Sequence, residues 1–165
     1  MFTGDKNRKI PWNEIVMIVY DFDGVMTDNR VIVSQDGSES VMVSRADGQG
    51  VGMIRTMGID QMILSTEVNP VVERRAEKLK IPVIHGVKDK RKSMEEYCAL
   101  HSIDEKKVFF IGNDVNDRGV MEFVGWCGAP KDAEEEILSI ADWISEKNGG
   151  YGVVRTLARE IGQNR

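Results

Sequence analysis

The chain has 165 residues, of which 41% are hydrophobic and 30% charged, and its formal net charge is −5. This length allows one domain with its own core, and the acidic balance argues against nucleic acid or an anionic membrane surface as a partner. Two cysteines are too few for a disulfide framework, and the first 14 residues carry no signal-peptide core. We therefore expect a single cytoplasmic domain over residues 1–165 with no membrane span.

Apolar runs alternate with amphipathic segments along the chain. This alternation predicts an α/β fold, in three layers, with a parallel sheet covered by helices on both faces. Strands are expected at 15–20, 60–65, 82–85, 108–111, 126–129 and 143–144. Helices are expected at 47–57, 71–79, 88–101, up to 124, at 133–140 and from 153. Residues 1–14 are expected to be a lead-in, with Trp12 capping the sheet edge, and Asp47 is expected to be a helix N-cap.

One segment breaks this alternation. The pair Asp36-Gly37 lies between two runs rich in β-branched residues, which predicts a β-hairpin over residues 30–43. Because it interrupts an α/β pattern, the hairpin should project from the sheet and expose apolar side chains unless another subunit covers them. The sequence therefore predicts a cyclic homo-oligomer, with the hairpin as a minimal cap and as the assembly element.

Two carboxylates mark the end of the first expected strand. Asp21 and Asp23 follow the apolar run 15–20, and Gly24 allows the chain to turn away. Ligands bind at the carboxyl ends of strands in open α/β sheets, and carboxylates this close repel each other unless a cation such as Mg²⁺ lies between them. A simple polar turn is the alternative interpretation of this segment.

Three further loops should meet at the same edge. Ser65 and Thr66 end the second strand and offer hydroxyl and amide donors to a phosphoryl oxygen, while Lys90 can place a positive charge on a phosphate and on Asp21. The acidic loop 112–117 can complete a cation site. Each of these features alone is common in turns or solvated helix faces, but their combination in this order favours phosphoryl transfer.

The segment DFDGVMTD at 21–28 resembles the first motif of the haloacid dehalogenase (HAD) superfamily. The closest resemblance is to the capless phosphatases of 3-deoxy-ulosonate phosphates, which act on KDO 8-phosphate or KDN 9-phosphate, and to the related domain of acylneuraminate cytidylyltransferases. Further matching segments are RADG at 45–48, ERRAEKL at 73–79, HGVKDK at 85–90, GNDVND at 112–117 and GGYGVVR at 149–155. The resemblance implies an Mg²⁺-dependent homotetramer in which one subunit helps to close its neighbour's site, and we expect the tail from Gly149 to reach toward that site from a flexible Gly149-Gly150 joint.

The resemblance also implies roles for individual residues. Asp21 would be the nucleophile that forms an aspartyl-phosphate, and Asp23 would be the general acid and then the base. The metal would be held by Asp21, Asp23 and the loop after residue 111. This loop departs from the family pattern, because Asn113 stands where a carboxylate is usual. The amide oxygen of Asn113 can still ligate Mg²⁺, or Asp114 can supply the carboxylate in its place. Asp117 would orient the metal ligands without binding the metal itself.

The resemblance further points to the substrate. Thr27, Glu67, Arg75 and Lys78 match positions near the substrate, which Arg75 and Lys78 would approach in part from the neighbouring subunit. A Glu at position 67 favours a nonulosonate 9-phosphate, such as KDN or N-acetylneuraminate 9-phosphate, over KDO 8-phosphate. An Arg can bind a substrate carboxylate through two parallel hydrogen bonds. The alternative is that Arg75 and Lys78 belong to a solvated, charge-balanced helix face.

Two other functions remain open from the sequence. A receiver domain of a signalling protein also has a phosphorylated Asp, a Mg²⁺ site and a lysine, but its lysine lies near the end of the chain, whereas Lys90 precedes the last acidic loop. The second alternative is a catalytically weak module attached to a sialic-acid cytidylyltransferase, which the neutral Asn113 keeps open.

Overall fold

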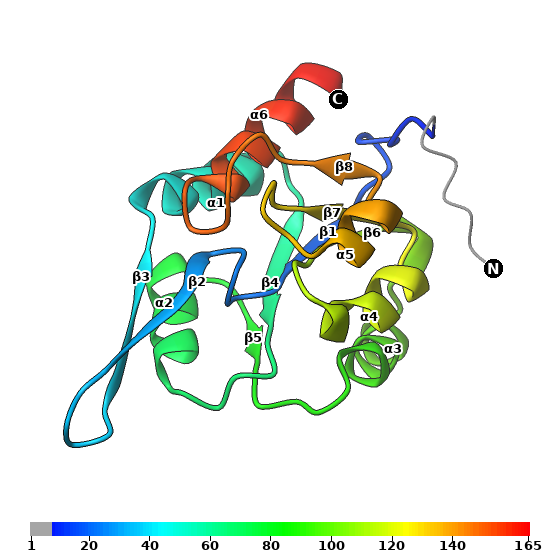
Figure 1. Cartoon of the computed structure of the whole chain (residues 1–165). Helices are drawn as coiled ribbons and strands as arrows, with labels where there is room; N and C mark the ends of the chain where they lie inside the picture. Colours follow the sequence, from blue (N-terminus) through cyan, green and yellow to red (C-terminus); the bar gives the residue numbers. More distant parts are fainter. Residues whose placement is uncertain (1–7) are drawn as a thin grey trace.

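A computed structural model describes residues 8–165 and contains a six-stranded parallel sheet. Its strands are β1 (Met17–Tyr20), β4 (Asp60–Leu64), β5 (Val83–Ile84), β6 (Val108–Ile111), β7 (Trp126–Ala129) and β8 (Trp143–Ile144). Their order in the sheet is β5-β4-β1-β6-β7-β8 (Figure 1). The α/β class predicted from the sequence is therefore confirmed, and every predicted strand is present.

In the described part of the chain, six α-helices cover the two faces of this sheet. They are α1 (Arg45–Thr56), α2 (Val71–Leu79), α3 (Lys90–His101), α4 (Arg118–Phe123), α5 (Glu135–Ile140) and α6 (Val153–Asn164). Side chains of a strand alternate between faces, so Ile18 and Tyr20 pack with α1, α2 and α6, whereas Met17 and Val19 pack with α3, α4 and α5. This arrangement gives the predicted three layers. Within residues 8–165, no helix combines the length and apolar character needed to cross a membrane.

Trp12 does not cap the sheet edge as predicted. Its ring is buried, with its centroid 5.0 Å from that of Phe109, which lies on the inner strand β6. Trp12 therefore packs on a face of the sheet, where a large aromatic ring buries more apolar area than it would at an edge. The predicted lead-in of residues 1–14 falls partly outside the described residues, which begin at residue 8.

The predicted role of Asp47 is also wrong. Ser44 is the N-cap of α1, and its hydroxyl oxygen accepts a hydrogen bond from the Ala46 amide. Asp47 is instead fully buried in the first turn, where its Oδ1 accepts from the Val154 amide at 2.9 Å. The carboxylate thus caps α6, a helix that begins more than a hundred residues later, and local sequence rules could not detect this partner.

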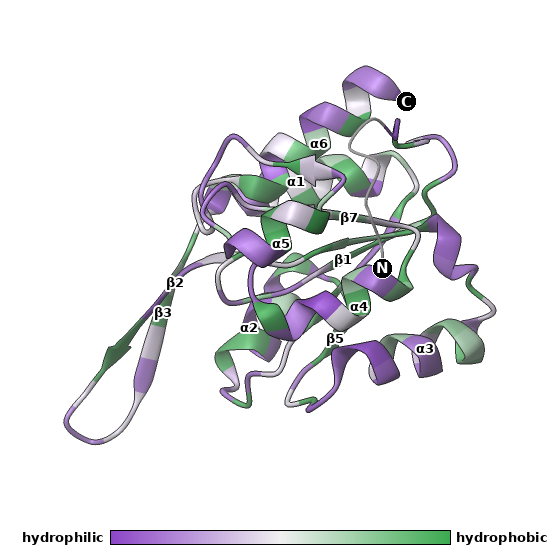
Figure 2. Cartoon of the chain, turned by 45° about the vertical axis from the view of Figure 1, so that its right-hand side comes forward, coloured by the Kyte–Doolittle hydropathy of each residue, from purple (hydrophilic) through white to green (hydrophobic). Residues whose placement is uncertain are grey.

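The predicted hairpin consists of β2 (Thr27–Val33) and β3 (Glu39–Val43), which pair antiparallel and separately from the main sheet. It projects well away from the body of the molecule (Figure 1) and carries hydrophobic residues along both strands (Figure 2). Ile32 is 63% exposed, Val33 64% and Met42 70%. The expectation that the hairpin projects with uncovered apolar side chains is confirmed in the single chain.

The segment before α6 packs tightly against the turn that follows β1. The Gly150 amide donates to the Val25 carbonyl oxygen at 3.0 Å, and the Gly149 amide donates to Asp132 Oδ1 at 2.8 Å. A Cβ atom at Gly149 would lie 2.0 Å from the Gly24 carbonyl oxygen. The expectation of a flexible Gly149-Gly150 joint is therefore wrong, because both glycines are fixed on their own chain's turn. The expected reach of the tail toward a neighbouring chain stays a prediction.

We predict that Gly149→Ala destabilises the protein by about 1–3 kcal/mol, because the added methyl group must push backbone apart. The measurement is the free energy of unfolding in urea. The matched control is Gly52→Ala in α1, where a Cβ would meet no atom within 4 Å, and where alanine should stabilise the helix by about 0.5–1 kcal/mol. Equal free energies of unfolding of Gly149→Ala and wild type would contradict the prediction, because they would show that the backbone around Gly24 accommodates the methyl group without loss of stability.

Candidate active site

The chain leaves β1 at the point where the sheet order reverses. The next strand of this sheet along the chain, β4, pairs with one edge of β1, and the later strand β6 pairs with its other edge. A crevice forms outside the carboxyl ends of the strands at such a switch point. Asp21 follows β1, Ser65 follows β4 and Asn113 follows β6, so the structure brings these three predicted residues to one edge.

A buried ammonium group connects two carboxylates in this crevice. Lys90 Nζ lies 2.6 Å from Asp21 Oδ1 and 2.6 Å from Asp117 Oδ1, and the side chains of Lys90, Asp21 and Asp117 are 1%, 7% and 0% exposed. Lys90 is the first residue of α3, and Asp89 caps that helix by accepting from the Lys92 amide. The lysine therefore emerges from a fixed helix start and points into the crevice.

The environment shifts the pKa values of both partners. Burial raises the pKa of Asp21 to about 7; the nearby Asp117 carboxylate adds to this, and the Lys90 ammonium works against it. Burial alone would lower the pKa of Lys90, but Asp21 and Asp117 outweigh it, so this pKa is raised. Lys90 is consequently protonated, and its ammonium is the positive charge that is shared by the carboxylates of Asp21 and Asp117.

Asp23 lies two residues further on, at the start of a single helical turn. The amides of Met26 and Thr27 close this turn by donating to the Phe22 carbonyl oxygen at 2.8 and 3.2 Å, and Gly24 lies within it with a φ of 85°. Burial raises the pKa of Asp23, a hydrogen bond from Thr27 lowers it, and the Glu67 carboxylate raises it. A carboxyl group with a raised pKa can hold a proton for donation to a leaving group.

Thr27 has a different role from the substrate contact that the sequence predicts. Its side chain is fully buried, and its Oγ1 donates to Asp23 Oδ1 at 3.1 Å while accepting from the amides of Gly24 and Asn29. Thr27 is therefore a positioning residue for Asp23. Thr27 is the first residue of the strand that follows the turn, and its hydroxyl group gave no sequence signal for this role.

Asn113 faces the two acidic residues. With its amide oriented to satisfy its hydrogen bonds, Nδ2 donates to Asp21 Oδ2 and to the Asp23 carbonyl oxygen, both at 2.9 Å. The opposite orientation would turn the amide oxygen onto the same two oxygens. Neighbouring ligands of an octahedral Mg²⁺ lie about 2.9 Å apart when the bonds are about 2.1 Å long. The oxygens of Asp21, Asp23 and Asn113 therefore fit a small hard cation.

Asp114 does not point at this cluster as predicted. Its Oδ1 accepts from the Val115 amide at 2.6 Å and caps the short helix η2 (Val115–Asp117). Asp117 Oδ2 accepts from the Asn113 amide at 2.9 Å, which places Asp117 behind the site, as expected. Within residues 8–165, no group of three or more His, Cys, Asp or Glu side chains is arranged to hold a metal, since two of the three oxygens here come from a carbonyl and an amide.

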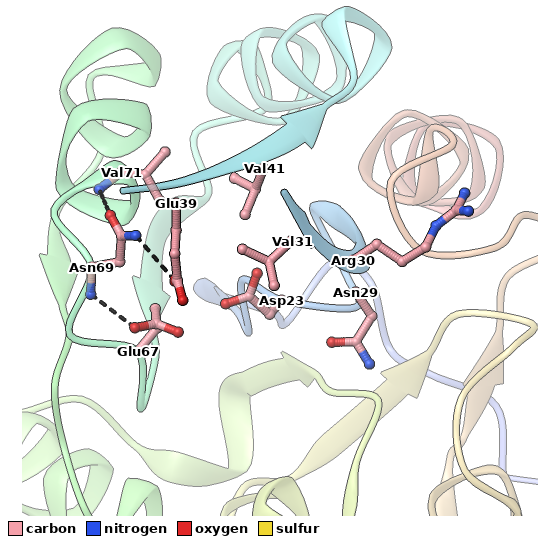
Figure 3. Close-up of a pocket in the computed structure, with 9 residues that line it drawn as sticks. All are labelled: Asp23, Asn29, Arg30, Val31, Glu39, Val41, Glu67, Asn69 and Val71. Atoms are coloured by element: carbon pink, nitrogen blue, oxygen red, sulfur yellow. Dashed lines mark hydrogen bonds between the residues drawn. The ribbon is translucent and has the colours of Figure 1, made fainter. Parts of the chain in front are cut away.

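A pocket of about 260 Å³ opens beside Asp23 (Figure 3). Its lining comes from the hairpin, from the loop after β4 and from the start of α2, and comprises Asp23, Asn29, Arg30, Val31, Glu39, Val41, Glu67, Asn69 and Val71. Glu67 lies at this mouth, where the sequence placed it. The sequence did not identify Glu39 or Asn69, whose side chains lie 3.5 Å apart across the pocket wall.

Ser65 and Thr66 differ in their surroundings. Ser65 is buried at the end of β4, and its Oγ accepts from the Glu67 amide at 3.1 Å. The Thr66 side chain is exposed. Both residues stand at the strand end next to Asp21, and their predicted contact with a phosphate stays a prediction.

Arg75 and Lys78 lie away from the pocket of their own chain. Arg75 Nη2 donates to the Ser44 carbonyl oxygen at 2.8 Å, which ties α2 to the start of α1. Lys78 is exposed on α2. The predicted substrate contact by these two residues is therefore not made within one chain, because the helix turns Arg75 toward α1.

The sequence of the chain is similar to those of known proteins. The 3-deoxy-D-manno-octulosonate 8-phosphate phosphatase of Yersinia pestis is 32% identical over 142 residues, which cover 86% of this chain and 76% of that protein. N-acylneuraminate cytidylyltransferase A of Danio rerio is 27% identical over 147 residues, which cover 88% of this chain and 34% of that protein. This chain therefore spans only part of the cytidylyltransferase.

The fold of the chain is also similar to that of a solved structure. The 3-deoxy-D-manno-octulosonate 8-phosphate phosphatase of Moraxella catarrhalis, in complex with a magnesium ion, a phosphate ion and KDO, matches with a TM-score of 0.89 and 26% identity over 93% of this chain and 89% of that chain. The family model for haloacid dehalogenase-like hydrolases matches residues 67–157. With this match and the relative from Yersinia pestis, the chain belongs to the haloacid dehalogenase-like hydrolases.

Proposed function

We propose that this hydrolase is an Mg²⁺-dependent phosphatase that cleaves the phosphate ester of a sugar acid. The observation that carries the proposal is the buried Asp21, which is held by Lys90 through Oδ1 and has its Oδ2 beside the Asp23 carbonyl and Asn113. A carboxylate fixed in this way next to a second, proton-holding carboxyl group suits in-line attack on phosphorus.

In the proposed first step, a carboxylate oxygen of Asp21 attacks phosphorus and the bond to the sugar oxygen breaks. Asp23 gives its proton to the leaving oxygen, so an alcohol departs and an aspartyl-phosphate remains on Asp21. In the second step, the ionised Asp23 takes a proton from water, and the water oxygen attacks phosphorus to release phosphate and restore Asp21. Thr27 holds Asp23 at 3.1 Å in position for both transfers.

Lys90 would contribute electrostatics to both steps. Its ammonium lies 2.6 Å from the attacking carboxylate and can offset negative charge on the phosphoryl group. Asp117 keeps this ammonium in place from the other side. Mg²⁺, held by Asp21, the Asp23 carbonyl and Asn113, would supply further charge neutralisation for the phosphoryl oxygens.

The pocket beside Asp23 supports a polyhydroxylated leaving group. Glu67 Oε1 accepts from the amides of Val68 and Asn69 at 2.7 and 2.9 Å, so the loop holds its carboxylate toward the pocket. Carboxylate and amide groups of Glu39, Glu67 and Asn69 can accept or donate hydrogen bonds to hydroxyl groups. Together with the similarity to phosphatases of 3-deoxy-D-manno-octulosonate 8-phosphate, this favours a sugar-acid phosphate, and we favour a nonulosonate 9-phosphate.

A second candidate function is a catalytically weak module of a sialic-acid cytidylyltransferase. It is favoured by the similarity to a segment of the Danio rerio enzyme and by the neutral Asn113 in the cation site. A receiver-like signalling role is not proposed, because the chain belongs to a hydrolase family.

The nucleophile is tested with Asp21→Asn. We expect the rate of phosphate release with Mg²⁺ to fall by about 10³-fold or more, because an amide cannot form the acyl-phosphate. The free energy of unfolding should change little, since the amide oxygen can still accept a hydrogen bond from Lys90 and one buried charge is removed. Phosphate release from a panel of sugar phosphates and circular dichroism are the measurements. Near wild-type turnover by Asp21→Asn would exclude the mechanism, and no release by the wild type would favour the weak module.

The substrate is tested by comparing kcat/KM for KDN 9-phosphate and KDO 8-phosphate. We expect a preference for the nine-carbon substrate that falls by about tenfold in Glu67→Ala, because one hydrogen bond to a substrate hydroxyl is lost. Glu73→Ala is the matched control, since Glu73 is exposed on α2 and outside the pocket lining. A preference for KDO 8-phosphate, or an unchanged ratio in Glu67→Ala, would contradict this choice.

We also propose that the hairpin joins copies of the chain into a homotetramer, since it exposes Ile32, Val33 and Met42. Met42→Asp should shift the mass measured by sedimentation at micromolar concentration from a tetramer to smaller species. Leu100→Asp is the control, because Leu100 is 79% exposed on α3 and away from the hairpin. A monomeric wild type would refute the proposal.

A further inference from the structure

We infer that Asn29 is a specificity-determining residue, whose side-chain amide binds a hydroxyl group of the sugar next to Asp23. The inference rests on the proposed phosphatase function and adds to it a residue that selects a polyhydroxylated leaving group. It is carried by the backbone conformation of Asn29, by the bulge that contains this residue and by its place in the pocket.

The backbone of Asn29 has a left-handed conformation. Within residues 8–165, the residues other than glycine with a positive φ are Asn29 at 63°, Lys80 at 56° and Ser102 at 53°. Lys80 and Ser102 are the C-caps of α2 and α3, where a left-handed residue commonly ends a helix. Asn29 lies inside the strand β2, so no helix end accounts for its conformation. A residue held in this way inside a strand points to a functional reason.

Asn29 belongs to a bulge in the hairpin. The register of β2 against β3 shifts between Thr27 and Val31, and Asn29 lies between these two residues. Side chains of a regular strand alternate between its two faces, yet Asn29, Arg30 and Val31 are consecutive and all line the pocket. Bulges turn a side chain to a new direction, often next to an active site. The bulge therefore brings Asn29 to the pocket.

The bulge is tied to Asp23 by one hydroxyl group. Thr27 Oγ1 accepts a hydrogen bond from the Asn29 backbone amide at 3.1 Å and donates one to Asp23 Oδ1 at 3.1 Å. The position of Asn29 relative to Asp23 is consequently set by the same group that holds the acid of the proposed reaction. Because Asp23 would protonate the leaving oxygen, a side chain fixed beside it is well placed to contact the sugar.

The side chain of Asn29 is available to a ligand. It is exposed, and Figure 3 shows it near Asp23 with no hydrogen bond to another lining residue. The neighbouring Arg30 differs, because its side chain extends away from the pocket in Figure 3 and its Nε donates to Asp28 Oδ2 at 3.1 Å. Of these two neighbours in the bulge, Asn29 is therefore the one that can bind the sugar.

The other polar groups of the pocket complement an amide at this position. Glu39 and Glu67 contribute carboxylates, which only accept hydrogen bonds when ionised. The Asn69 amide has a partner at each end, since Oδ1 accepts from the Val71 amide at 3.0 Å and Nδ2 donates to Glu39 Oε2 at 3.5 Å. A hydroxyl group can donate to a carboxylate and accept from an amide at the same time. Asn29 thus supplies N–H donors opposite an acidic wall, which suits a polyol chain.

Asn29→Gly tests the inference, because glycine adopts a φ of 63° without strain and the variant loses only the side chain. The substrates are p-nitrophenyl phosphate, whose leaving group has no further hydroxyl group, and whichever of KDN 9-phosphate and KDO 8-phosphate the wild type cleaves faster. We expect the ratio of kcat/KM for the sugar ester to kcat/KM for p-nitrophenyl phosphate to fall by about tenfold. An unchanged ratio would overturn the inference.

Ser102→Gly is the matched control. It relieves the same backbone conformation at the end of α3, outside the pocket lining. In this variant the ratio of the two kcat/KM values should stay within about twofold of wild type, because no group near the sugar is removed. An equal fall of the ratio in Ser102→Gly would show that the backbone change, and not the lost amide, causes the effect, and would overturn the inference.

Binding separates this inference from the proposed reaction. In the Asp21→Asn background, calorimetry measures the affinity for KDN 9-phosphate and KDO 8-phosphate without turnover, and adding Asn29→Gly should weaken the tighter binding by about tenfold. Unchanged affinity, or no binding of either ester, would overturn the inference. A wild type that cleaves neither ester, together with binding that depends on Asn29, would refute the proposed phosphatase function alone.

Discussion

The buried ammonium of Lys90 is the interaction on which the site depends. Removing a charge from water costs several kcal/mol, so a fully buried lysine persists only if partners compensate it. Asp21 and Asp117, each 2.6 Å away, provide that compensation. Asp21 is fixed at the end of β1, and Asp117 Oδ2 accepts from the backbone amide of Asn113. With both carboxylates ionised, the three charges sum to −1, which leaves a net negative charge in the crevice that a further cation can neutralise. The fold thus fixes the carboxylate of Asp21, the proposed nucleophile, and the same three residues leave negative charge that favours a bound cation.

Close packing of backbone against backbone shapes the rest of the crevice. Gly149 and Gly150 lie on the turn that carries Asp23, and Gly24 makes room for Asn113. None of these contacts tolerates a methyl group without movement. The cap of α6 by Asp47 holds the far end of the Gly149–Gly152 segment. The C-terminal helix is therefore connected, through backbone contacts, to the turn that positions the acid of the proposed reaction.

Sequence patterns identified the elements but not the contacts between distant ones. The strand β1 and the residues Asp21, Asp23 and Lys90 could be predicted, because an apolar run that ends in carboxylates reports both a strand and its functional end. The partners of Asp47 and Arg75 could not be, since Val154 and Ser44 lie 107 and 31 residues away and no local rule links them. Thr27 was misassigned for a related reason, because a hydroxyl in a motif does not reveal whether it faces ligand or carboxylate.

One face of the hairpin lines the pocket, and the opposite face is turned to the outside of the molecule. Val31, Glu39 and Val41 line the pocket, although Val31 is itself 48% exposed, whereas Ile32 and Met42, one residue along each strand, are 63% and 70% exposed. Adjacent residues of a strand point to opposite faces, so a partner bound to the outer face would also fix the inner one. The lining includes the acids Asp23, Glu39 and Glu67 but only one cation, Arg30. A substrate carboxylate would be repelled by this wall unless positive charge came from outside the pocket, and Arg75 is turned toward Ser44. The acidity of the pocket and the exposed apolar side chains of the hairpin both agree with the proposed homotetramer, in which a second chain would cover the hairpin and supply the missing positive charge.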